Sequence, residues 1–269
     1  MRRSLLLLLF CMAADARGQI SLRTGLAQDK PVKPGMIYHA EILIRNDTAQ
    51  PQEAKIYQTD YLFYADGTNE YGEPGSTLRS NATWIDFSPA LLLIPPGETI
   101  PVNYSVTVPE SVGGEPLSGT YWSMLMVEPI QAGDSESRLP RKPQAVEYGV
   151  RQVMRYGVQV ATHIEEQARY DVSFTGVDLI AEADGRKVLE VIIENTGDAM
   201  ISPSVWVEIY DAAGSEKERL MGSSFRLYPG TSVMQRMELN HLAKGNYEAL
   251  IVVEAAGDYI VGAQYTLVL

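Results

Sequence analysis

The chain has 269 residues, and its 34 acidic side chains against 22 Lys and Arg give a formal net charge of −12. Because nucleic-acid affinity depends on cations that neutralise phosphates, this balance argues against a nucleic-acid partner. One cysteine and three histidines exclude a disulfide scaffold and disfavour a structural zinc site. The hydrophobic content of 45% is enough for packed cores, and the length predicts about two domains.

Residues 1–18 have the pattern of a cleaved signal peptide. Arg2 and Arg3 precede an apolar run, Leu5 to Met12, that is too short to span a bilayer. Small residues at positions 14 and 16 then supply a cleavage site, with a second possible register at 16–18. We therefore expect a periplasmic or secreted mature chain without cysteine, and no integral membrane segment after cleavage. A short membrane anchor is the alternative interpretation.

Three segments of the first half recur in the same order in the second half, which predicts an internal repeat. The matched pairs are 41–46 with 190–195, 93–98 with 226–231, and 119–128 with 245–254. Apolar and polar residues alternate in these segments, and Asn, Pro-Gly and Asp-Gly turns separate them. We expect an all-β protein with two immunoglobulin-like antiparallel β-sandwich domains in tandem, at 19–166 and 167–269. The segment 131–144 is polar and poor in apolar residues, so we expect it to form a mobile loop in the first domain. We expect a second long loop at 68–81.

The segment Val146 to Ile164 alternates between apolar and polar residues almost without a break. This period of two predicts a strand much longer than usual, or two shorter strands joined by a bulge near Gly157. Alternation is first a signal of burial, so one interpretation is the last strand of the first domain's own core. A second interpretation adds function, because a long strand with a free edge can pair with a segment of another protein.

Short motifs of the first half follow one another in an order typical of a known family. They are Trp84-Ile85, Ser88-Pro89, Pro96-Gly97, Val108-Pro109 and Gly119-Thr120-Tyr121-Trp122. A variable loop and a long alternating strand come next. In this order the chain resembles the first domain of periplasmic pilus-assembly (PapD-like) chaperones. It is also similar to WxL-interacting cell-surface proteins, which share the Trp-Ile, Ser-Pro, Pro-Gly and Gly-Thr-Tyr motifs and are implicated in cell-wall contact.

The chaperone resemblance implies a mode of binding. These chaperones donate their long strand to a subunit and hold the subunit's C-terminal carboxylate on two basic residues. By position, Arg23 on the first strand and Arg155 or Arg151 on the donated strand would form this charge-assisted contact. The remaining partner contacts would come from the apolar row of the same strand: Val150, Gln152, Met154 and Tyr156.

The sequence has no motif for catalysis or for cofactor binding. His39, His163 and His241 lie far apart, with no metal-ligand spacing around them. No nucleophile elbow and no phosphate-binding glycine loop occurs. We therefore expect a protein-binding protein that is not an enzyme and has no cofactor. Its expected role is a periplasmic chaperone or assembly factor that adds its 146–164 strand to another extracytoplasmic protein, with a pilin-like subunit as the candidate partner. A structural cell-surface or cell-wall adaptor of the WxL-interacting type is the alternative, and a carbohydrate-binding module a third.

Overall fold

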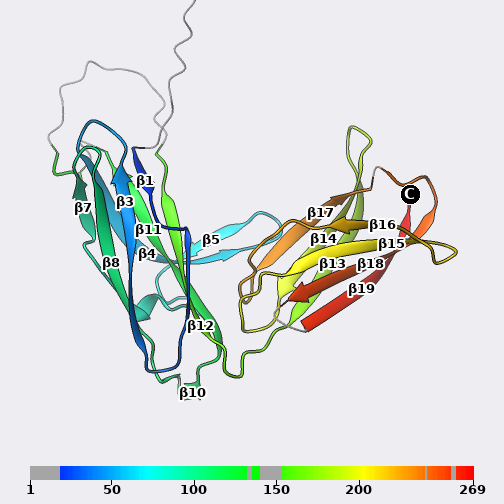
Figure 1. The fold of residues 1–269 in the computed structure, drawn as a ribbon, viewed down its shortest axis with the longest axis horizontal. Coiled ribbons are helices and arrows are strands. Elements are labelled where there is room, and N and C mark those ends of the chain that lie inside the picture. Colours follow the sequence, from blue (N-terminus) through cyan, green and yellow to red (C-terminus); the bar gives the residue numbers. More distant parts are fainter. Residues whose placement is uncertain (1–18, 132–134, 140–152, 240, 256–258) are drawn as a thin grey trace, which may run out of the picture.

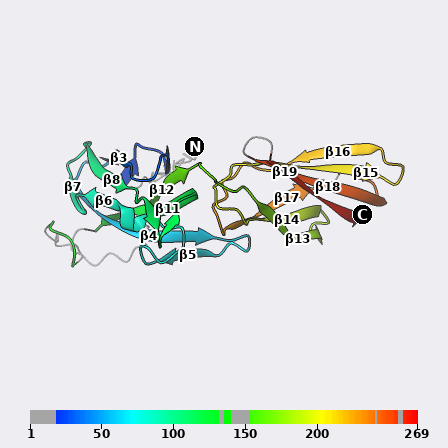
Figure 2. The ribbon, with the colours of Figure 1, turned by 90° about the horizontal axis from the view of Figure 1, so that it is seen from below.

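Two β-sandwiches follow one another along the chain and lie end to end at an angle (Figures 1 and 2). The computed structural model describes residues 19–131, 135–139, 153–239, 241–255 and 259–269. Apart from one 3-10 helix, η1 (Ala82–Trp84), the described elements are strands. The predicted fold class is therefore confirmed. In this described part, no helix is long and apolar enough to cross a membrane. The predicted signal peptide, 1–18, lies outside the described residues.

The first sandwich consists of two sheets and a short hairpin. One sheet has the order β1 (Ile20–Leu22), β3 (Ile37–Asn46), β8 (Thr99–Thr107), β6 (Ile85–Ser88). The other has the order β2 (Ala27–Pro31), β12 (Tyr156–Ile164), β11 (Gly119–Ile130), β4 (Gln52–Phe63), β5 (Asn69–Gly72), with β7 (Leu91–Ile94) also paired to β4. The hairpin is β9 (Ser111–Val112) and β10 (Glu115–Pro116). All pairings are antiparallel except the one between β2 and β12, which is parallel.

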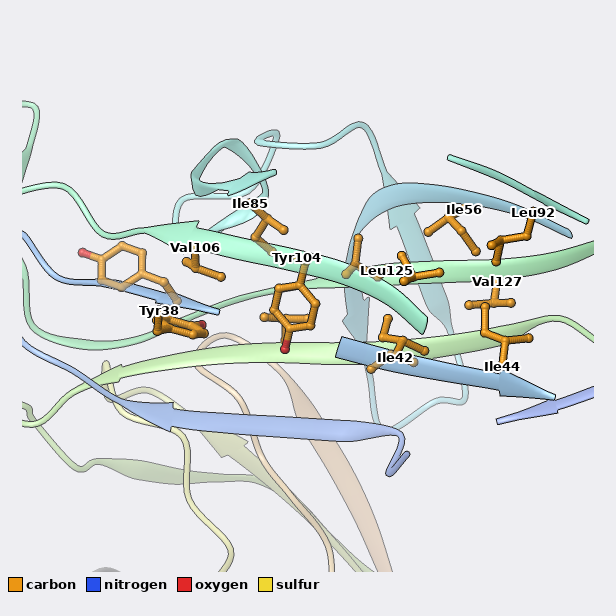
Figure 3. Close-up of a cluster of buried hydrophobic side chains, with 14 of the residues drawn as sticks. Tyr38, Ile42, Ile44, Ile56, Ile85, Leu92, Tyr104, Val106, Leu125 and Val127 are labelled. Carbon is orange, nitrogen blue, oxygen red and sulfur yellow. The ribbon is translucent and has the colours of Figure 1, made fainter. Parts of the chain in front are cut away.

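Alternating side chains from both sheets form the first core (Figure 3). On β3, Tyr38, Ile42 and Ile44 point inward, as the period of two predicts. Leu125 and Val127 of β11 meet them from the opposite sheet. β11 differs from the other strands because its outward-facing residues are buried too. Both faces of this strand are therefore in use, and its outer face lies next to the site and the domain interface described below.

The second sandwich repeats this plan with fewer strands. One sheet has the order β13 (Val172–Ala181), β14 (Lys187–Asn195), β17 (Ser232–Glu238). The other has the order β16 (Glu216–Met221), β15 (Ser204–Asp211), β18 (Asn246–Ala255), β19 (Tyr259–Val268). A separate core fills it, with Leu189, Val207 and Ile251 fully buried at its centre. The predicted domain boundary at 166–167 falls in the connection between β12 and β13.

Two buried asparagines show the internal repeat at atomic level. The Asn46 amide donates to the carbonyl oxygens of Gln50, Ile94 and Pro95, and its backbone bonds to the Pro96-Gly97 turn. At the matching place, the Asn195 amide donates to the carbonyl oxygens of Ala199 and Leu227, and its backbone bonds to the Pro229-Gly230 turn. Each asparagine therefore joins the end of one strand to a turn of another.

The segment predicted as a second long loop is partly a strand, and the second domain contains a tyrosine corner. The segment 68–81 was predicted as a loop, but its first part forms β5, which pairs with β4 through the Asp66-Gly67 turn. Aromatic packing accounts for this, because the rings of Tyr61 and Tyr71 lie opposite each other with centroids 5.0 Å apart. The tyrosine corner typical of immunoglobulin-like domains occurs in the second domain, where the Tyr247 hydroxyl donates to the Ala243 carbonyl oxygen.

An aromatic cluster joins the two sandwiches. The rings of Trp122 on β11 and Tyr228 of the second domain stack with centroids 4.2 Å apart, and Ala161 packs beside them. Next to this cluster, the Thr120 amide donates to the Asp198 carbonyl oxygen at 2.7 Å. Gly119 allows this close approach, because it has a φ of 73° and a Cβ there would lie 2.0 Å from that oxygen.

Charged side chains form a second contact between the domains. Arg226 donates to both carboxylate oxygens of Asp29, which lies on β2. His163 of β12 bonds to the same carboxylate at 2.9 Å through Nε2, and to the Thr120 hydroxyl through Nδ1. Burial acts to raise the pKa of Asp29, but the hydrogen bonds from Arg226 and His163 outweigh it and hold the pKa below its ordinary value of 3.8.

This carboxylate gives a testable dependence on pH. A folded-state pKa below the unfolded value contributes stability that is present above that unfolded value and is lost as the pH falls through the folded pKa. We expect Asp29→Asn to be less stable than the wild type at pH 7, and the difference to shrink towards zero at strongly acidic pH. Urea midpoints of both proteins from pH 7 to pH 2 measure it. Asp86→Asn, an exposed change in the same domain, is the control. A difference that stays constant with pH would contradict the assignment.

Candidate protein-binding site

The two sides of β12 are paired over different lengths. On one side, β12 pairs with β11 from Tyr156 to Ile164. On the other side, β2 covers only Gln159 to His163, and the Gln159 amide donates to the Leu26 carbonyl oxygen. Backbone groups two residues apart point to the same side of a strand, so those of Gly157 face the side that β2 leaves uncovered. Within the described residues no strand pairs there, and β12 therefore has a free edge at its N-terminal end.

The strand predicted at 146–164 begins later than expected within the described residues. Val153, Met154 and Arg155 precede β12 and have no strand structure, while 146–152 lie outside the described residues. Pro129 accounts for this start. The odd-numbered residues of β11 exchange hydrogen bonds with β12, and Pro129, which would face Met154, has no N–H to donate. The ladder therefore stops at the pair of Val127 and Tyr156.

A cavity of about 540 Å³ lies on the outer face of the sheet beside this free edge. Met124 and Met126 form its floor, where Gly157 leaves room for them: a Cβ at that glycine would lie 2.2 Å from the Met124 Cε. Val153 and Met154 line the same cavity and are 41% and 48% exposed. Flexible methionine side chains adapt to apolar partners of varied shape. The cavity therefore offers an adaptable surface, with apolar methionine and valine side chains next to unpaired backbone groups.

Aromatic and charged side chains form the rim of the cavity. Its remaining lining residues are Tyr57, Thr59, Tyr71, Arg155 and Gly157. The Tyr57 hydroxyl donates to Glu128, whose carboxylate is also 3.9 Å from the Arg155 guanidinium. The hydrogen bond with Tyr57 and the charge of Glu128 raise the pKa of Arg155. Arg155 is 60% exposed, so its cation is accessible at the edge of the cavity.

The structure does not bring Arg23 and Arg155 together, and Arg151, the predicted alternative to Arg155, lies outside the described residues. Arg23 follows β1 and pairs with Asp47 at 3.1 Å, on the outer face of the β1–β3–β8–β6 sheet. Hydrogen bonding from Ser21 is the largest cause that holds the pKa of Asp47 below its usual value. Arg155 lies on the outer face of the opposite sheet, because its neighbours Tyr57 and Glu128 point away from the core. A single carboxylate therefore cannot contact both arginines in this arrangement.

The other predicted contact residues divide into three groups. Met154 lines the cavity, and its contact with a partner stays a prediction. Tyr156 does not, because it packs against the first core and its hydroxyl donates to the Ile20 carbonyl oxygen at 2.9 Å. The row of even positions is broken where the chain leaves the strand at Arg155, so these two side chains point to different faces. Val150, Arg151 and Gln152 lie outside the described residues.

Seven lining residues were not predicted as contacts from the sequence: Tyr57, Thr59, Tyr71, Met124, Met126, Val153 and Gly157. The signal for the two methionines was present, since they alternate with Leu125 and Val127 and must face away from the first core. Among the described residues, no group of three or more His, Cys, Asp or Glu side chains is placed to hold a metal ion.

The sequence and the structure were compared with those of known proteins. No protein-family model and no curated protein matches the sequence. The structure resembles fimbrial chaperones. The class 5 fimbriae chaperone CfaA is 10% identical, with a TM-score of 0.47 over 93% of this chain and 99% of that one. The E. coli chaperone DraB is 15% identical, with a TM-score of 0.39 over 93% and 98%.

A third similar structure is a complex. It is the CsuC–CsuE chaperone–tip adhesion subunit pre-assembly complex from the archaic chaperone-usher Csu pili of Acinetobacter baumannii. The identity is 12%, with a TM-score of 0.42 over 92% of this chain and 97% of that one. The resemblance to pilus-assembly chaperones stated from the sequence motifs is thus confirmed as a resemblance.

Proposed function

We propose that this protein binds another extracytoplasmic protein by β-strand addition at the free edge of β12, and acts as a periplasmic chaperone or assembly factor. The observation that carries the proposal is the unequal pairing of β12. β2 covers its C-terminal part, while the uncovered N-terminal part lies beside the exposed apolar side chains of Val153 and Met154 and a cavity of mixed polar and apolar lining. Unpaired backbone groups give affinity to an incoming strand, and neighbouring pockets give specificity.

The position of β2 defines how an incoming strand would lie. Because β2 already occupies the edge from Gln159 to His163, an added strand would pair at Gly157 and beyond it, in line with β2. Its side chains on the outer face would enter the cavity over Met124 and Met126. Those on the other face would extend the first core next to Tyr156. We propose that Val150, Arg151 and Gln152 continue this binding segment on its N-terminal side.

Arg155 is the anchor that we propose for an anionic group of the partner. Its present carboxylate neighbour, Glu128, is 3.9 Å away, which is longer than a charge-assisted hydrogen bond. A partner carboxylate can approach Arg155 more closely than Glu128 does, because the guanidinium is 60% exposed. Arg23 is already bonded to Asp47 on the opposite face, so we assign the anchor to Arg155 alone.

A substitution at the cavity tests the proposal. We expect Met154→Asp to weaken partner binding at least about tenfold, which corresponds to about 1.4 kcal/mol, because it places a charge in an apolar contact. The measurement is affinity capture from periplasmic extract with the tagged mature protein, followed by mass spectrometry. Leu78→Asp is the matched control, because Leu78 is 99% exposed and lies outside the cavity. Circular dichroism should show both variants folded.

The capture experiment has three informative outcomes. A stoichiometric small β-rich protein that is retained by Leu78→Asp and lost by Met154→Asp supports strand addition at this site. A partner that both variants retain would contradict it. Recovery of cell-wall fragments or a membrane-anchored surface protein, without such a subunit, would instead indicate the adaptor role.

A further inference from the structure

The strand β19 forms a long edge without the features that usually protect sheet edges. Natural edge strands are protected by charges, prolines, bulges or short length. Among the described edges, β2 ends in Lys30-Pro31, β13 has a register shift between Phe174 and Gly176, and β16 begins with four charged residues, 216–219. β19 has ten residues, no charge, no proline and no register shift. In Figure 1 it runs along the lower border of the second domain, with no strand beyond it.

The hydrogen bonds to β18 determine which groups of β19 face outward. Leu269 and Gly245 exchange both of their backbone hydrogen bonds, so odd-numbered residues of β19 pair with β18. The amides and carbonyls of the even-numbered residues therefore point to the free edge. These residues are Ile260, Gly262, Gln264, Thr266 and Val268. Any strand that pairs with β19 must bond to this set.

We propose that β19 pairs antiparallel with β19 of a second copy of this chain, about a two-fold axis at Gln264. In a symmetric pair, even-numbered residues of one strand must lie opposite even-numbered residues of the other, because only these have outward-facing backbone groups. A two-fold axis at Gln264 meets this condition and pairs the two strands over residues 260–268. In this register Ile260 of each copy faces Val268 of the other, and Gly262 faces Thr266. The two four-stranded sheets then form one continuous sheet.

Two observations favour a second copy as the occupant. Ile260 and Val268 are 60% and 66% exposed, and the two-fold register covers each with the other on the outer face. β19 itself also carries no charged residue in a chain with a net charge of −12, and the Glu248 carboxylate that Gln264 and Thr266 bond to belongs to β18, one strand back from the edge. Two copies can therefore pair along β19 without placing like charges directly opposite each other. A single strand pair buries less than the roughly 1,200 Å² typical of stable interfaces, so we expect a reversible dimer.

Cysteine cross-linking tests the register. The one cysteine of the chain, Cys11, lies in the predicted signal peptide, so an introduced thiol has no competitor in the mature protein. In the proposed pair the two Gln264 Cα atoms lie about 5.5 Å apart, within disulfide range. The two Thr266 positions are offset by four residues, about 13 Å. We expect mild oxidation to dimerise Gln264→Cys and to leave Thr266→Cys monomeric. Equal dimer yields, or none from Gln264→Cys, would overturn the register.

Sedimentation equilibrium tests the dimer itself. The wild-type mature chain should show a concentration-dependent monomer–dimer equilibrium, and Thr266→Pro should shift it to monomer. Proline at this position removes an outward N–H and leaves the β18 ladder intact, because Thr266 does not bond to β18 through its backbone. Leu78→Asp, a change on the first domain, should leave the equilibrium unchanged. A wild type that stays monomeric at millimolar concentration would overturn the proposal.

Discussion

Replacing Asn195 with alanine is expected to destabilise the second domain by about 3–5 kcal/mol, since several buried groups lose a partner at about 1–3 kcal/mol each. The side chain is 1% exposed and donates to the carbonyl oxygens of Ala199 and Leu227. Its own oxygen accepts from the Gly197 amide at 2.9 Å. Alanine leaves these groups buried without a partner, and of the links between Asn195 and the segment 227–231 only the two backbone hydrogen bonds remain.

Urea unfolding of the wild type and the variant measures this effect. Asn246→Ala is the matched control, because Asn246 is exposed in the same domain and its loss should change stability by less than about 0.5 kcal/mol. By the internal repeat, Asn46→Ala should destabilise the first domain to a similar extent, with exposed Asn103→Ala as its control. If either buried asparagine tolerates alanine as well as its control does, the network has no such structural role.

The fold was predictable from the sequence because burial imposes its period on strands. Alternation around Ile42 and Ile193 identified core strands, and Pro-Gly and Asp-Gly pairs marked the turns between them. The repeat was predictable because both copies need an asparagine at the same place, where the strand ends against a turn. Such signals are local, so they need no knowledge of distant contacts.

The candidate site was less predictable because it depends on pairings between distant segments. The parallel strand β2 comes from 27–31, and nothing near β12 in the sequence shows that it covers Gln159 to His163. Pro129 was a readable signal for the start of β12, but its effect depends on the register between β11 and β12. Arg23 and Arg155 matched a family pattern by order along the chain, and order alone does not place them on the same face.

The domain interface could not be predicted from the sequence either, because its central residue precedes an ordinary Pro-Gly turn. Tyr228 stands directly before a Pro-Gly turn, where the sequence suggested only a loop between strands. In the structure it is fully buried, and its ring stacks on Trp122 of the first domain while Phe63 contacts it edge-on. Residues that join two domains carry no periodic signal, because each contributes to a contact that the chain makes once.

Replacing Tyr228 with alanine is therefore expected to have the second large effect. Burying a ring of this size contributes about 3–5 kcal/mol by comparison with other aromatic truncations. The hydroxyl adds a hydrogen bond accepted from Arg226 at 2.9 Å and one donated to the Gln159 side chain at 3.3 Å. Because the contacts of Tyr228 with Trp122, Phe63 and Gln159 cross the interface, we expect Tyr228→Ala to weaken the coupling between the domains more than either core.

Scanning calorimetry measures this coupling, because two domains that lose their interface unfold in better separated transitions. Tyr228→Phe keeps the stacked ring and removes only the hydroxyl, so it should cost about 0.5–1.5 kcal/mol and leave the transitions coupled. If both variants behave alike, the hydroxyl network with Arg226 and Asp29 rather than the Trp122 stack joins the domains. The angle between the sandwiches depends on this interface.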